Sequence, residues 1–285
     1  MATLQAIKHR IRSVNSTRQI TKAMQLVAAS KLRRAQAAAV TARDYTAGMK
    51  ALLSSLQSTD GLAEQKLYQV RPVRRALMIV VSGDRGLAGA YNSKVLRALS
   101  QRLAGMRVVA SAICVGRRAA LHVARLTDVE EVAAYDIDGH DAVTGLAQPI
   151  LNEAVELFLN GSADSVQLVS TQFVNTVRQD VQVQQLLPVV PTPAAPYEQT
   201  MEPGPTRLVD FATRRMLEAL LLQSVLDARA SEQAARMLAM MSATDNAKEL
   251  VADLTLTLND ARQAAITQSL AEITGGAEAI NQAGA

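Results

Sequence analysis

Apolar residues recur at alternating spacings of three and four over residues 4–56, which predicts one long helix that packs against a partner helix. In the middle of this segment the seam turns polar, at Arg18, Thr21 and Gln25. Apolar residues Ile20, Met24 and Val27 lie on a neighbouring face there. A thin coiled coil has little interior, so we expect its outer face at this level to meet another surface. The apolar seam positions are Leu4, Ile7, Ile11, Val14, Ala28, Leu32, Ala35, Ala39, Ala42, Met49, Leu53 and Leu56.

A second long segment, residues 206–274, contains neither glycine nor proline and predicts a second long helix. It is preceded by "EPGPT" and followed by "GG", which are start and stop signals. Ordinary globular helices average about 11–12 residues, so this length favours a coiled coil. If residue 56 lies level with residue 206, paired positions in the antiparallel coil sum to about 262. The last dozen or more residues of the second helix would then project beyond the first.

Between the two long helices, residues 75–190 alternate strand and helix patterns. Strands are expected at 75–83, 107–116, 165–174 and 177–189, and helices at 92–105 and 142–161. Such alternation predicts a small, mainly parallel sheet. The expected fold is therefore α/β: a long antiparallel coiled coil of N- and C-terminal helices plus a small Rossmann-like domain. Its parts are residues 1–57, 75–190 and 206–274, with 275–285 as a tail.

Charge is concentrated in the first helix. The chain carries a net charge of +4, yet residues 1–50 hold ten Lys and Arg residues and one acid, Asp44. A helix this basic predicts an acidic partner, which could be nucleic acid, a membrane surface or an acidic protein face.

No catalytic, cofactor-binding or metal-binding residues are predicted. Cys114 is the single cysteine and lies in an apolar strand, and the histidines (His9, His122 and His140) are scattered. Gly83, Gly86 and Gly89 follow a strand, but their spacing fits neither the Rossmann nor the Walker phosphate loop. We interpret them as a tight strand-to-helix turn, with a nucleotide-binding enzyme as an alternative. No apolar run is long enough to span a membrane.

Three motifs, "ITKAMQLVAASKLRRAQ", "SGDRGLAGAYN" and "SEQAARMLAMMSATDNA…NDARQAAITQSLAEI", closely resemble the γ subunit of F-type ATP synthase. The resemblance covers essentially the whole chain, in order. It implies a non-catalytic central rotor shaft whose termini form a coiled coil inside an α3β3 head. The α/β block would lie below, against the ε subunit and the ring of c subunits. Because the heptads begin at Leu4 and no large insertion is present, we expect no leader and a location on the cytoplasmic face of a bacterial inner membrane.

The resemblance also implies contact residues. Met24 matches the methionine of the "KAM" motif, close to an acidic lever loop of the β subunit, and Arg236 of "AARM" would lie beside it. The polar set of "ARQAxITQ", which touches a catch loop of β, is matched by Arg262, Gln263 and Thr267, while Ser269 stands where glutamate is common. Further contacts with the head are expected from Lys22, Arg33, Arg34 and Met237.

A foot that meets the c-ring is matched by Glu202 and Pro203, although Met201 replaces its usual tyrosine. The main alternative from another class is a basic coiled-coil protein that binds nucleic acid. That alternative predicts steeply salt-dependent binding to a duplex, whereas the resemblance implies no nucleic acid and an association with the membrane only through the complex.

Overall fold

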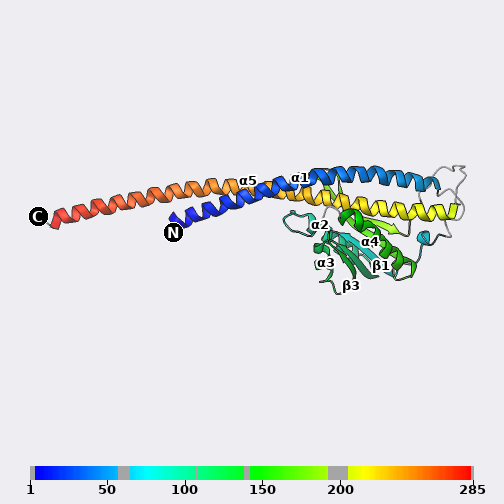
Figure 1. Ribbon diagram of the computed structural model, residues 1–285. Coiled ribbons are helices and arrows are strands. Elements are labelled where there is room, and N and C mark those ends of the chain that lie inside the picture. Colours follow the sequence, from blue (N-terminus) through cyan, green and yellow to red (C-terminus); the bar gives the residue numbers. More distant parts are fainter. Residues whose placement is uncertain (1–3, 57–64, 107, 138–141, 192–204, 284–285) are drawn as a thin grey trace. The chain divides into compact units, whose positions relative to one another are not determined.

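The computed structural model describes residues 4–56, 65–106, 108–137, 142–191 and 205–283. It divides into two compact units: Ala28–Met237, and Met1–Val27 together with Leu238–Ala285. Two long helices run through both units, and a sheet lies in the first (Figure 1). The elements in chain order are α1 (Leu4–Leu56), η2 (Lys66–Tyr68), β1 (Arg75–Val81), α2 (Tyr91–Ala104), β2 (Val109–Val115), α3 (Arg117–Val123), β3 (Val129–Tyr135), α4 (Ala142–Leu159), β4 (Ser165–Phe173), β5 (Gln179–Leu187) and α5 (Pro205–Ala283).

The sheet of the larger unit has the strand order β3-β2-β1-β4-β5. Strands β1 to β4 are parallel, and β5 returns antiparallel beside β4. The chain steps outward from β1 to β3, then crosses through α4 to the other side of β1. This is a doubly wound, Rossmann-like arrangement, so the α/β fold predicted from the sequence is confirmed. The order of connections reverses between β1 and β4, which is where proteins of this topology bind ligands.

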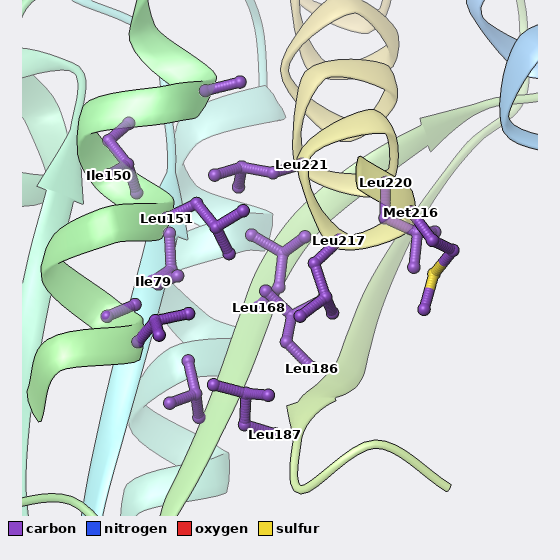
Figure 2. Close-up of a cluster of buried hydrophobic side chains, with 14 of the residues drawn as sticks. Ile79, Ile150, Leu151, Leu168, Leu186, Leu187, Met216, Leu217, Leu220 and Leu221 are labelled. Atoms are coloured by element: carbon purple, nitrogen blue, oxygen red, sulfur yellow. The ribbon is translucent and has the colours of Figure 1, made fainter. Parts of the chain in front are cut away.

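Each face of the sheet is covered by different helices, because successive side chains of a strand point to opposite faces. Met78 and Val80 of β1 pack with buried residues of α2 and α3. Ile79 packs on the other face with α4 and the first part of α5. Figure 2 shows this second layer. Ile150 of α4 and Leu217 of α5 lie on the same face of the sheet, next to Ile79 and Leu168.

Within the larger unit α1 lies beside α5 and runs in the opposite direction (Figure 1). The hydroxyl of Thr46 donates a hydrogen bond to the Ala219 carbonyl at 3.2 Å, and Arg43 contacts Asp227. These pairs differ from the expected pairing by up to about two helical turns. At the Thr46–Ala219 contact the pairing follows the expected sum of about 262 to within one helical turn.

The smaller unit is the remaining part of the two helices. Ile7, Thr21, Met240 and Ala247 are buried there, and half-buried residues continue the α5 seam as far as Ala261. From 262 to 275 every described side chain is exposed. The prediction that "GG" ends the helix is wrong, because α5 continues through both glycines to Ala283. A glycine costs a helix only about 1 kcal/mol and leaves its backbone hydrogen bonds in place.

Candidate functional site

The polar stretch of the α1 seam has a specific partner on α5. In the smaller unit, Thr244 donates a hydrogen bond to the hydroxyl of Thr21 at 2.8 Å. Thr21 in turn donates to the carbonyl of Arg18 at 3.1 Å. Thr21 is buried, while Arg18 and Gln25 are half-buried. Where the apolar seam is interrupted, the two helices therefore contact each other through hydrogen-bonded hydroxyl groups and not through packed aliphatic side chains.

Large apolar side chains lie on the outside of the helices at the same level. Ile20 is 60% exposed, Val27 56% and Met241 47%. Met24 is half-buried. Exposed apolar side chains gathered on one stretch of a slender helix are typical of a contact with another protein, which is the surface that the sequence predicts around Met24.

The basic side chains expected at an interface are on the surface of α1. Lys22 is exposed and donates to the side chain of Gln25 at 3.3 Å. In the larger unit, Arg33 and Arg34 are exposed, whereas their neighbour Leu32 packs on α5. The cationic face of α1 therefore points to solvent in the chain by itself.

The polar residues predicted near the end of α5 are also exposed. Arg262, Gln263 and Thr267 lie beyond Ala261, on the part of the helix where every described side chain from 262 to 275 is exposed. Ser269 lies in the same stretch and is exposed. The predicted foot, Glu202 and Pro203, lies outside the described residues, as do Met201 and His140.

Two residues expected at the interface are held inside the larger unit. The guanidinium of Arg236 pairs with Glu232 at 2.6 Å and donates to the Gly86 carbonyl at 3.3 Å. Its side chain is only 12% exposed. Met237 is half-buried and packs with Leu32 and Phe173. Both side chains therefore contact their own chain.

The glycine loop after β1 lies at the carboxyl end of the sheet and is fixed by side chains. Asp84 accepts hydrogen bonds from the amides of Arg117 and Ile137, at 2.8 and 3.0 Å. Asn92 accepts from the amide of Gly83 at 2.9 Å and donates to the Arg85 carbonyl at 3.2 Å. This network confirms a tight strand-to-helix turn.

The carboxylate of Glu232 fills the space beside this turn. A Cβ atom added at Gly83 would lie 2.8 Å from its Oε1 atom, so the carboxylate would have to move to accommodate a larger residue. Tyr91, the first residue of α2, is buried beside the same pair. Burial raises the pKa of Tyr91, the nearby carboxylate of Glu232 raises it further, and Arg236 opposes the shift.

A second junction joins α1, α5 and the end of β4. Arg43 pairs with Asp227 at 2.7 Å and also donates to the carbonyl of Phe173. The side chain of Asp227 is 4% exposed. Its burial raises the pKa of Asp227, and hydrogen bonds from Arg43 and Gln223 oppose that shift.

The sequence singled out Arg236 for a subunit contact, but it predicted neither the pairing of Arg236 with Glu232 nor the Arg43 junction. Glu232 and Arg236 stand four residues apart on a helix, a spacing that favours an ion pair. That signal could have found the pair, but not its contact with the loop after β1. Among the described residues, no group of three His, Cys, Asp or Glu side chains could hold a metal ion, and no helix is long and apolar enough to cross a membrane.

The fold defines a class: a protein with a Rossmann-like α/β domain and two long terminal helices that carry exposed apolar and basic side chains. A family model described as "ATP synthase" matches residues 3–280. An ATP synthase gamma chain from Heliobacterium modesticaldum is 39% identical over 294 residues, covering 98% of this chain and 100% of the relative. One from Acidithiobacillus ferrooxidans is 40% identical over 288 residues, with 98% and 100% covered. The chain belongs to the ATP synthase gamma chain family.

Solved structures agree on the fold. A chain of the rotor of the Euglena gracilis mitochondrial ATP synthase superposes with a TM-score of 0.68 at 18% identity, covering 92% of this chain and 98% of that one. A chain of the central stalk and c-ring structure from Tetrahymena thermophila gives 0.59 at 21% identity, with 79% and 99% covered. These similarities confirm the combination of long terminal helices and an α/β domain.

Proposed function

We propose that this chain is the central rotor shaft of an F-type ATP synthase and catalyses no reaction itself. The observation that carries the proposal is identity of about 39% to bacterial gamma chains along the whole length of both proteins. A fold with two long helices extending through a second unit supports it. In this role the chain couples rotation of a c-ring to conformational change at the nucleotide-binding subunits of the head.

The partners follow from the surfaces. The exposed apolar residues around Met24 and the basic side chains of Lys22, Arg33 and Arg34 fit the acidic inner face of a ring of α and β subunits. The exposed residues Arg262, Gln263 and Thr267 contact the same ring near the end of α5. The ε subunit and the c-ring bind the α/β block, with Glu202 and Pro203 at the foot.

The mechanism requires only unequal contacts. A surface shifts a conformational equilibrium when it binds the two conformations with different free energies. A shaft without threefold symmetry presents a different face to each of three β subunits, so each is biased toward a different conformation. Rotation then moves every β subunit through the same sequence of states. Methionine at the contact surface adapts to changing partners at low cost.

The relatives are bacterial gamma chains, and we place this chain on the cytoplasmic face of a bacterial inner membrane as a peripheral part of the complex. Affinity purification of the tagged chain from washed membranes tests the proposal. We expect it to co-purify at low salt with large nucleotide-binding subunits, and ATP hydrolysis in the eluate to require those subunits. Recovery of the chain alone or with nucleic acid would contradict the proposal.

A further inference from the structure

We propose that Glu232 and Arg236 form a latch that holds the glycine loop, residues 83–90, against α5, and that this latch is required for coupling. Arg236 is then a positioning residue that acts through the loop. The inference rests on the proposed function for its coupling role, whereas the latch itself rests on contacts within the larger unit.

The place of the latch in the fold is the first argument. The loop follows β1 at the reversal point of the strand order, where doubly wound proteins hold an anionic ligand group against glycine amides. Here the carboxylate of Glu232 on α5 lies beside the loop, while the Gly83 amide donates to Asn92. The Glu232 side chain is 8% exposed and lies against Gly83, so close that a Cβ atom there would displace the carboxylate.

The second argument is that one guanidinium joins both parts. Arg236 pairs with Glu232, which neutralises a buried carboxylate, and the same Nη2 atom donates to the carbonyl of Gly86. Hydrogen bonds to charged groups are stronger than neutral ones, more so when water is excluded. The pair therefore links the backbone of the loop directly to α5.

The third argument is that the loop is held in a conformation that it would not favour alone. Leu87, next to Gly86, has a φ of 61° and a side chain that is 62% exposed. A left-handed conformation is costly for leucine and persists only where the surroundings impose it. Two anchors just before Leu87 help to impose it here: Asp84, and the Gly86 carbonyl that Arg236 binds.

Two independent substitutions break the latch. Arg236→Gln removes the ion pair and the bond to Gly86. Gly83→Ala changes neither charge but places a methyl group where the Glu232 carboxylate lies. Adding Glu232→Asp to Gly83→Ala shortens the acid by one methylene and should restore the fit. Gly145→Ala is the matched control, because a Cβ atom there meets nothing within 4 Å.

The measurements are hydrogen exchange of the loop peptide and protons pumped per ATP hydrolysed, both on the assembled complex. We expect Arg236→Gln and Gly83→Ala to speed loop exchange about tenfold and to lower the pumping ratio. The Gly83→Ala/Glu232→Asp variant should recover both, and Gly145→Ala should change neither.

Unchanged loop exchange in both latch variants would overturn the latch. Faster exchange with an unchanged pumping ratio would overturn its role in coupling. If Arg236→Gln does not assemble, Gly83→Ala and its Glu232→Asp partner decide the question. A wild-type complex without ATP-driven pumping would instead contradict the proposed function, and the exchange result would still decide whether the latch exists.

Discussion

Thr21 of α1 and Thr244 of α5 join their hydroxyl groups across the helix seam at 2.8 Å, at a level where the first helix lacks apolar seam residues. Each hydroxyl also reaches a carbonyl of its own helix, Arg18 for Thr21 and Met240 for Thr244. Both hydroxyl groups thus have hydrogen-bond partners, although no aliphatic side chains pack in this part of the seam. Exposed Ile20 and Val27 leave apolar surface for a partner.

Replacing these threonines by valine tests the pairing. Thr21→Val or Thr244→Val alone should cost about 1 kcal/mol or less, because the remaining hydroxyl keeps its backbone partner. The double variant should cost less than the sum of the two, since either single variant already removes the hydrogen bond between the hydroxyls. Urea unfolding of the full-length chain measures the three values, and strictly additive losses would show that the two residues do not interact.

Met24→Lys should lower the protons pumped per ATP hydrolysed more than it lowers the yield of assembled complex. On the proposed contact surface, the new charge would bind an acidic partner surface in some rotor positions and not in others. Gln19→Lys is the control, because it adds the same charge at an exposed position about 140° round the helix. An unchanged pumping ratio in Met24→Lys would exclude this residue from the coupling surface.

Much of the fold could be predicted from the sequence because its signals are local. The seams of α1 and α5 follow a repeating period, β1 is an apolar run, and β4 is a segment rich in Val, Thr and Phe that turn residues precede. Helix α3 and strand β3 gave no such signal: α3 spans only seven residues, and β3 is an edge strand with exposed Glu130 and Glu131. Strand β3 depends on its pairing with β2, and α3 depends on packing Ala119 and Val123 against the sheet.

The candidate site was predictable in part for the same reason. Motifs within one helix are enough to propose contact residues such as Met24 and Arg262. The latch of Arg236 and the junction of Arg43 depend on residues up to 184 positions apart. Such contacts are set by how α5 crosses the sheet, which no local pattern encodes.

Removing Arg43 should destabilise the chain more than removing its partner Asp227. Arg43→Met should destabilise the chain by about 3 kcal/mol, because it leaves the buried Asp227 carboxylate without its charged partner. Asp227→Leu should cost less, since the side chain of Arg43 is 34% exposed and its guanidinium can reach water. Equal losses for the two variants in urea unfolding would contradict this explanation.

The same junction predicts a pH dependence. The pKa of Asp227 is raised in the folded chain, chiefly by burial, so the native state binds this proton more readily than the unfolded state does. The stability lost in Arg43→Met should therefore shrink as the pH falls from neutral toward about 5. A loss that grows on acidification would mean that the carboxylate is stabilised by its surroundings.

Cys114 should resist thiol reagents in the folded chain. Burial, and secondarily Glu131, raises the pKa of its thiol to about 12. Near pH 8 this lowers the thiolate fraction roughly a thousandfold. Labelling should therefore follow unfolding, and its rate in increasing urea should rise with the unfolded fraction. Rapid labelling in native buffer would show that the thiol is accessible.

Truncation after Ala261 should leave the unfolding midpoint of the chain unchanged, because the described side chains from 262 to 275 are exposed. In the assembled complex the same truncation should reduce ATP-driven proton pumping, since it removes Arg262, Gln263 and Thr267. A large fall in the midpoint would show that the end of α5 folds back onto the chain.

Rotation of this chain inside its complex tests the central claim most directly. Val109→Cys, at a position that is 69% exposed, combined with Cys114→Ala, allows a visible probe to be attached to the α/β block. With the head fixed to a surface and ATP added, we predict one-way rotation of the probe in about three steps per turn, one for each β subunit. A probe that stays still while the same complexes hydrolyse ATP would contradict the account.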